Sequence, residues 1–294
     1  MKLLLLGHRG QLGWELQRSL APLGDIVTAE RHVADFSRPD QLAALVKSQR
    51  PRIVVNAAAY TAVDRAESEP ELARAVNALT PGALARECAA IDAILVHYSS
   101  DYVLDGSGNT PRDESASTAP LNAYGRTKLE GETLVRASGC RHLMLRTSWV
   151  YSARGSNFPK TMLRLAAERD RLTVVDDQFG APTSAELLAD VTAHALSTVL
   201  RRPDLCGLYH VAAGGETSWH ALATFVIEHA RAAGAPILVA ANAIEAVHSE
   251  AFSTAARRPA NSRLDTSRFR TTFGLNLPHW QRGMERLLDE LLAR

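Results

Sequence analysis

Short apolar runs recur along the first half of the chain, with longer helix-like stretches between them. The runs cover residues 3–6, 26–27, 53–55, 94–96 and 143–145. Such alternation is typical of βαβ units, because neighbouring parallel strands need a crossover connection. Strands that are buried on both faces also give continuous apolar runs. The pattern therefore predicts an α/β fold built on a doubly wound parallel sheet of the Rossmann type.

The regular rhythm loosens after about Arg146. Residues 158–169, 185–200, 219–233 and 279–292 look helical and 207–211 looks like a strand, whereas 151–157 reads as a loop and 176–182 as a turn. We predict a Rossmann part over residues 1–146 and a smaller, mainly substrate-binding part over residues 147–294, with interleaved segments. Without a repeat or a flexible linker between them, the two parts should pack as one body.

Composition excludes several classes of protein. Lys and Arg total 33 against 32 Asp and Glu, so no global field would hold nucleic acid or an anionic membrane. The opening apolar run stops at Gly7, and no run approaches the roughly 18 residues of a membrane span. Cys88, Cys140 and Cys206 lack C-x-x-C spacing, as expected of reduced thiols. We expect a cytoplasmic protein with no nucleic-acid or membrane partner.

Three glycines, Gly7, Gly10 and Gly13, follow the first apolar run at three-residue spacing. Without Cβ atoms the backbone can turn sharply and approach a pyrophosphate, and the helix expected from about Gln11 points its N–H groups at that group. An ordinary strand-to-helix turn is the alternative. Glu30, at the end of the second run, argues against it, because a carboxylate there can accept hydrogen bonds from the adenosine ribose. We predict a dinucleotide site.

Glu30 also bears on the choice between NADH and NADPH. A carboxylate about 4 Å from a 2′-phosphate would cost on the order of 4 kcal/mol at an effective dielectric constant of 20, which favours NADH. Arg31 could instead turn onto a 2′-phosphate, so both cofactors stay open.

Tyr124 and Lys128 are four positions apart at the start of an expected helix and share one face of it. A phenol is protonated near neutral pH and can give its proton to a ketone oxygen, while an ammonium group stabilises the phenolate. Ser100 follows the fourth run, at the strand end where open α/β sheets bind ligands, and its hydroxyl can polarise the carbonyl. Alone, each residue fits a solvated helix face or a strand-end cap. Together with the glycine turn they predict hydride transfer.

Seven segments carry a family resemblance over nearly the whole chain. They are residues 7–16, 35–37, 56–64, 98–103, 146–151, 177–183 and 256–259. On these segments the chain resembles the dTDP-4-dehydrorhamnose reductases, which are extended short-chain dehydrogenases. This resemblance implies reduction of dTDP-4-dehydro-L-rhamnose to dTDP-L-rhamnose by NADH or NADPH, in the supply of bacterial lipopolysaccharide.

The resemblance also implies roles for individual residues. Ser100, Tyr124 and Lys128 would be catalytic, with Lys128 and Tyr124 also at the nicotinamide ribose. Asp101 and Trp149 would contact the deoxysugar together with Ser100. Besides the three glycines, the dinucleotide would be lined by Gln11, Leu12, Glu30, Asp35, Phe36, Ala59, Tyr60, Thr61 and Tyr98.

A metal-supported homodimer is implied more weakly. Some similar enzymes dimerise through Mg²⁺ bound by glutamates, and Glu15 and Glu186 lie in matching segments. Oxygen ligands suit this ion. Solvated helix carboxylates without a metal are the alternative.

Three positions depart from the family pattern. Glu30 stands where Asp is common, Tyr60 where His is common and Ser100 where Thr is common. Serine keeps the hydroxyl but lacks the β-branch that stiffens χ1.

Arg257 and Arg258 could meet the substrate diphosphate or be a surface pair.

Two tryptophans at helix starts, Trp219 and Trp280, are predicted as core or interface anchors rather than stacking platforms.

Three other functions stay open. One is a nucleotide-sugar 4-ketoreductase of another stereochemistry, and one is an epimerase that holds NAD⁺ tightly. The third is a non-catalytic NAD(P)-binding subunit like the regulatory subunit of methionine adenosyltransferase. Retention of Ser100, Tyr124 and Lys128 argues against this last function.

Overall fold

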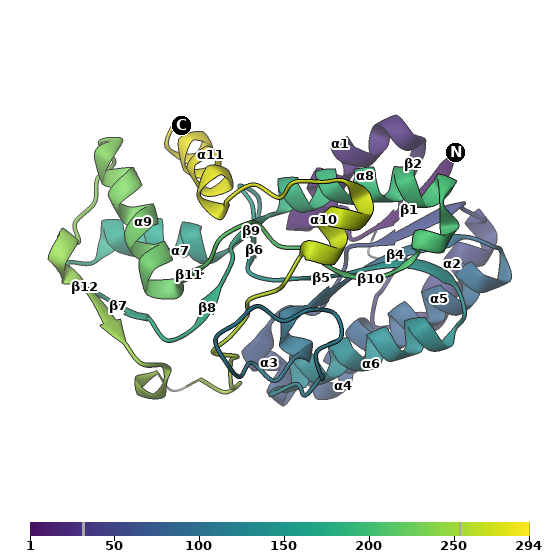
Figure 1. Cartoon of the computed structure of the whole chain (residues 1–294), viewed down its shortest axis with the longest axis horizontal. Helices are drawn as coiled ribbons and strands as arrows, with labels where there is room; N and C mark the ends of the chain where they lie inside the picture. The colour runs from purple at the N-terminus through teal and green to yellow at the C-terminus, as the bar shows by residue number, and fades with distance from the viewer. Residues whose placement is uncertain (31–32, 253, 294) are drawn as a thin grey trace.

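Six parallel strands form the central sheet of the computed structural model, which describes residues 1–30, 33–252 and 254–293. Their order across the sheet is β10-β5-β4-β3-β1-β2 (Figure 1). Strand β2 is therefore added on one side of β1, and the strands from β3 onward are added on the other side. This arrangement confirms the predicted doubly wound α/β fold. The strands are β1 (Lys2–Leu6), β2 (Asp25–Thr28), β3 (Ile53–Asn56), β4 (Ile94–Ser100), β5 (Arg141–Thr147) and β10 (Gly207–His210).

Helices cover both faces of this sheet, which explains why its strands read as continuous apolar runs. Leu3 and Leu5 of β1 belong to the core under α1 (Gln11–Leu20) and α8 (Ala185–Arg201), whereas Leu4 and Leu6 belong to the core on the other face. That second face is covered by α2 (Pro39–Gln49), α5 (Thr80–Ala90) and α6 (Ala123–Ala137). The helices flank the sheet above and below in Figure 1.

A smaller part lies beyond the sheet, at the left of Figure 1. Helices α7 (Phe158–Glu168), α9 (Trp219–Ala232) and α11 (Trp280–Leu292) share an apolar core with the parallel pair β7 (Leu172–Val175) and β12 (Ile244–Val247). The predicted turn at 176–182 is partly wrong, because it contains β8 (Phe179–Gly180), which pairs with β11 (Thr217–Ser218). A third short pair joins β6 (Val150–Tyr151) to β9 (Thr183–Ser184).

The remaining elements are short connections. They are α3 (Val63–Ser68), α4 (Pro70–Arg74), the π-helical turn η2 (Ala75–Leu79), α10 (Ser267–Phe273) and the 3₁₀ turns η1 (Ala21–Leu23), η3 (Asp101–Val103), η4 (Pro203–Leu205), η5 (Ala241–Ala243) and η6 (Ser249–Ala251).

Segments from beyond residue 146 complete the sheet. Strand β10 pairs with β5, and α8 packs on α1 over one face of the sheet. After it enters the smaller part, the chain therefore returns to the central sheet. The functional division at residue 146 stays a prediction. In the part of the chain that the structure describes, no helix is both long enough and apolar enough to cross a bilayer.

Candidate active site

A cavity of about 1040 Å³ opens at the carboxyl ends of the central strands. Its walls combine the turn after β1, the loop after β3, the end of β4 and the first turns of α6. All the predicted cofactor, catalytic and sugar-binding residues line it except Gly13. Glu15 and Glu186, the predicted metal ligands, are also absent from its walls.

The glycine turn has the geometry that a pyrophosphate requires. Gly7 has a φ of +79°, and a Cβ there would lie 2.8 Å from the backbone nitrogen of Ala58. A Cβ on Gly13 would lie 2.0 Å from the carbonyl oxygen of Gly7, so Gly13 allows α1 to pack beneath the turn. Among the described residues no side chain caps α1, and its first turn holds no acid. Its first N–H groups therefore suit a dinucleotide phosphate.

Glu30 lines the cavity where we predict that the adenosine binds, but it has a partner that the sequence argument did not foresee. The Arg9 guanidinium lies 2.7 Å from Glu30 Oε1, and His8 Nε2 lies 3.7 Å from the same oxygen. The guanidinium offsets the carboxylate charge, which weakens the electrostatic argument against a 2′-phosphate. Arg31, the other candidate phosphate ligand, lies outside the described residues.

Ser100 and Tyr124, two of the predicted catalytic residues, lie in the wall of the same cavity. Ser100 Oγ accepts a hydrogen bond from the Tyr102 backbone nitrogen at 3.2 Å and donates one to Asp101 Oδ1 at 2.9 Å. Burial raises the pKa of Tyr124 to about 12, and a hydrogen bond with Ser100 opposes that shift. The phenol therefore carries its proton at neutral pH, as a general acid must.

The first turn of α6 is held where Tyr124 lines the cavity together with Ser100. Asn122 Oδ1 caps the helix by accepting from the Gly125 backbone nitrogen at 2.8 Å. A Cβ on Gly125 would lie 2.2 Å from the carbonyl oxygen of Tyr102. Glycine thus lets α6 approach the segment that follows β4.

Lys128 is almost fully buried, with 1% of its surface exposed. Its ammonium group donates to the Tyr98 carbonyl oxygen at 2.5 Å. Burial lowers the pKa of Lys128 to about 8, and the negative charge of Glu132 opposes this. The backbone of β4 therefore holds the ammonium group that we predict to stabilise the Tyr124 phenolate. The Tyr98 phenol is turned away into the core, where it bonds Thr192 Oγ1 at 3.0 Å.

Asp101 carries a carboxyl group that is 2% exposed. Burial raises the pKa of Asp101 to about 6, against the opposing effects of the Ser262 and Ser100 hydroxyl groups. Among the described residues its Oδ2 atom is buried and meets no hydrogen-bond partner. An unpaired buried acceptor on the cavity wall suits a sugar hydroxyl, which would satisfy it.

Trp149 and Trp219 stack on each other at the far side of the cavity. Their ring centroids are 3.6 Å apart and the ring planes differ by 12°. Trp219 lines the cavity. We predicted it only as a core or interface anchor, so sequence reasoning did not identify it as part of the site. The sequence could not show this, because the two rings come from different elements. The prediction for Trp280 is confirmed, since that side chain is 5% exposed and lies in the core of the smaller part.

Asn77 does not line the cavity, but it supports residues that do, and sequence reasoning missed this role. It lies in the π-helical turn η2 and is 1% exposed. Its amide accepts from the Tyr60 backbone nitrogen at 2.8 Å and donates to the Tyr60 carbonyl at 3.1 Å and to Thr127 Oγ1 at 3.2 Å. These bonds tie the loop after β3 to α6 through Asn77. The available signal was one polar residue within an otherwise apolar run.

A buried ion pair was missed as well. Glu132 is fully buried and takes two hydrogen bonds from Arg146, each 2.7 Å long, and one from Ser99 at 2.6 Å. It lies one turn beyond Lys128 on α6, so the ion pair joins α6 to β5 and the Ser99 hydrogen bond joins α6 to β4. A glutamate at this spacing after Lys128 was the only sequence signal.

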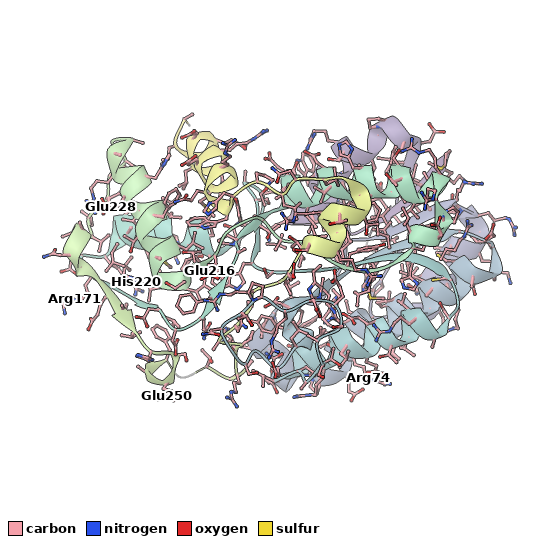
Figure 2. The ribbon with its side chains drawn as sticks, viewed as in Figure 1. Arg74, Arg171, Glu216, His220, Glu228 and Glu250 are labelled. Carbon is pink, nitrogen blue, oxygen red and sulfur yellow. The ribbon has the colours of Figure 1, made fainter. Side chains whose placement is uncertain are left out.

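A second cavity of about 1340 Å³ lies on the side of the smaller part, and Trp219 lines both cavities. Arg169, Arg171, Arg257 and Arg258 contribute to its wall. Figure 2 shows Arg171 at the outer end of the smaller part, above Glu250, which also lines this cavity. Arg258 is paired with Asp64 at 2.6 Å, whereas Arg257 is exposed.

The predicted magnesium ligands lie on α1 and α8, away from both cavities. Burial raises the pKa of Glu15, and the charge of Glu186 adds to this effect. Glu186 is 3.2 Å from Arg286. Within residues 1–30, 33–252 and 254–293, no group of three or more His, Cys, Asp or Glu side chains could hold a metal ion. These residues therefore do not fit a magnesium site within one chain.

Comparisons with known proteins agree with this geometry. The family model described as the RmlD substrate binding domain matches residues 1–293. A dTDP-4-dehydrorhamnose reductase of Escherichia coli (strain K12) is 53% identical, over 100% of this chain and 99% of the relative. A crystal structure of a dTDP-4-dehydrorhamnose reductase from Clostridium acetobutylicum is 33% identical with a TM-score of 0.90, over 99% of each chain.

A further solved structure bears on the cofactor. The Bacillus anthracis dTDP-4-dehydrorhamnose reductase in complex with NADP is 35% identical with a TM-score of 0.88, over 98% of this chain and 99% of that one. Similarity of this extent, together with the match over residues 1–293, shows that the chain belongs to the RmlD family.

Proposed function

We propose that the protein reduces the 4-keto group of dTDP-4-dehydro-L-rhamnose to give dTDP-L-rhamnose, with NADH or NADPH. The observation that carries this proposal is the convergence of Ser100, Tyr124 and Asp101 in the same cavity as the glycine turn. The family membership and the NADP complex of a relative support it. The Arg9–Glu30 pair is compatible with either cofactor.

The chemistry follows from the protonation states in the cavity. A reduced nicotinamide dinucleotide, which the glycine turn would hold by its pyrophosphate, would supply the hydride for C4. Tyr124, whose pKa is raised to about 12, gives its proton to the C4 oxygen. Ser100 shares a hydrogen bond with the phenol and stabilises the charge that develops on that oxygen. Lys128 orients the end of β4 through the Tyr98 carbonyl and keeps a positive charge near the reacting groups.

The second cavity suits the nucleotide diphosphate of this substrate. Guanidinium groups of Arg169, Arg171 and Arg257 on its wall can pair with phosphate oxygens. Because Trp219 lines both cavities, a sugar in the first could remain attached to a nucleotide in the second.

Tyr124→Phe tests the assigned chemistry. We expect kcat to fall by about 10² to 10⁴, since the general acid is lost, while NADH affinity stays within about threefold. Oxidation of NADH by the defined keto sugar gives kcat, and NADH fluorescence gives affinity. Tyr209→Phe is the matched control, because that phenol donates to the Leu205 carbonyl away from the cavities. Full turnover by Tyr124→Phe would refute the role of the phenol.

The same assay separates the other functions. An epimerase would turn over without stoichiometric consumption of NADH, and a ketoreductase of another stereochemistry would give a different sugar in the NMR spectrum of the product. A non-catalytic subunit would bind NADH and reduce no keto sugar. The homodimer and the cytoplasmic location stay predictions.

A further inference from the structure

The Trp149–Trp219 stack joins the sheet to the smaller part at the border of the two cavities. Trp149 follows the end of β5, whereas Trp219 opens α9 in the smaller part. Trp149 lines the first cavity only, and Trp219 lines both. The stack therefore lies where a sugar would meet the nucleotide that carries it.

Trp149 is held in an unusual backbone conformation. Its φ is +50°, in the left-handed region that non-glycine residues rarely occupy. A Cβ on Gly180 would lie 2.8 Å from Cε2 of the Trp149 ring, so only glycine leaves room for the indole on that side. The Trp219 ring covers the Trp149 face at a centroid distance of 3.6 Å.

Trp219 is itself fixed from the smaller part. It is the first residue of α9, whose N-cap Ser218 accepts from the Ala221 backbone nitrogen at 3.1 Å. The Phe158 ring packs against it at a centroid distance of 4.5 Å. A rigid helix start thus carries the ring that holds Trp149.

We propose that Trp219 is a positioning residue that locks the Trp149 indole against one side of the bound sugar and sets where C4 lies relative to Tyr124. The inference rests on the proposed function and adds a determinant of specificity to it. Loss of the stack frees Trp149 to change rotamer, so the sugar is no longer held in one place. A displacement of about 1 Å can cost on the order of 100-fold in rate. The glycine turn is not involved, so the dinucleotide should bind as before.

Trp219→Leu is the direct test, with Trp219→Phe as the conservative variant and Trp280→Phe as the matched control. We expect Trp219→Leu to lower kcat/KM for the keto sugar by about 10- to 100-fold and to weaken dTDP binding, with NADH affinity within about twofold. It should also abolish the exciton couplet of the stacked indoles in circular dichroism. Trp219→Phe should recover most of kcat/KM, because a stacking ring remains. Trp280→Phe should keep the couplet and kcat/KM.

Gly180→Ala gives an independent route if Trp219→Leu does not fold. Its methyl group would push the Trp149 ring out of the stack, so the same losses are expected with Trp219 intact. Wild-type kcat/KM in a variant that lacks the couplet would overturn the inference, as would a couplet that persists in Trp219→Leu. If the wild-type protein reduces no keto sugar, the proposed function fails, and unchanged dTDP affinity in Trp219→Leu would then overturn the inference separately.

Discussion

Replacing Asp101 by Asn should change stability in a way that depends on pH. The native carboxyl group is buried, and its pKa is raised from 3.8 to about 6. Between these two values the native state binds more protons than the unfolded state. The wild-type stability that comes from this group is therefore present below about pH 4 and lost as the pH rises through 6. Asparagine does not titrate, so the variant lacks this loss.

The magnitude follows from the pKa shift. A shift of about two pKa units corresponds to about 3 kcal/mol of unfolding free energy. With an unfolding entropy of about 2.1 cal/mol/K per residue, a chain of 294 residues turns this into a Tm difference of about 5 °C. The quantity to compare is the Tm of Asp101→Asn minus that of the wild type, at pH 4 and at pH 8. Any fixed cost of burying the amide cancels between the two pH values.

Differential scanning calorimetry across this range is the assay. We expect the Tm difference to move in favour of Asp101→Asn by about 5 °C between pH 4 and pH 8. Asp113→Asn is the control, because the Ser115 hydroxyl and backbone N–H lower the pKa of the exposed Asp113 below 3.8. The stability that this carboxylate contributes is lost only below about pH 4, so the Tm of Asp113→Asn relative to the wild type should stay nearly constant between pH 4 and pH 8.

As the pH rises from 4 to 8, Asp101→Asn should gain stability relative to the wild type, but at pH 8 it should lose activity. Asp101 Oδ2 is proposed to accept a sugar hydroxyl, so we expect kcat/KM of Asp101→Asn to fall by about tenfold at pH 8. A Tm difference that does not change between pH 4 and pH 8 would refute the reasoning, because it would mean that the buried carboxyl group has an ordinary pKa.

Two further substitutions test how the site is held. Gly13→Ala would place a methyl group 2.0 Å from the Gly7 carbonyl, and we expect NADH affinity to fall at least about tenfold by fluorescence titration; unchanged affinity would contradict the role of this glycine. Glu132→Gln leaves Arg146 buried without its charged partner, which should cost about 3 to 5 kcal/mol in thermal unfolding. Glu130→Gln removes only the exposed pair with Arg74, which Figure 2 labels. Its unfolding free energy should stay within about 0.5 kcal/mol of the wild type. Equal losses in the two variants would contradict the conclusion that the buried pair is more important for stability.

The sequence alone determined the features that depend on local chain chemistry. Period and length of the apolar runs predicted β1, β3, β4 and β5 within a few residues, because strands covered on both faces need apolar side chains at every position. The glycine turn and the Tyr124–Lys128 spacing were equally local. Gly7 could be recognised from the spacing of the three glycines, and the structure gives the reason for glycine there, because a Cβ would lie 2.8 Å from the Ala58 backbone nitrogen.

Only the tertiary structure decided the features that depend on contacts between distant segments. Three such contacts join different elements. They are the Trp149–Trp219 stack, the Arg9–Glu30 pair and the hydrogen bonds of Asn77 to Tyr60 and Thr127. The pKa of Asp101 likewise depends on how completely neighbouring elements exclude water. Burial and side-chain geometry arise only once the helices pack on the sheet. A tryptophan at a helix start, such as Trp219, can therefore lie in the core or line the site, and its sequence context does not distinguish the two positions.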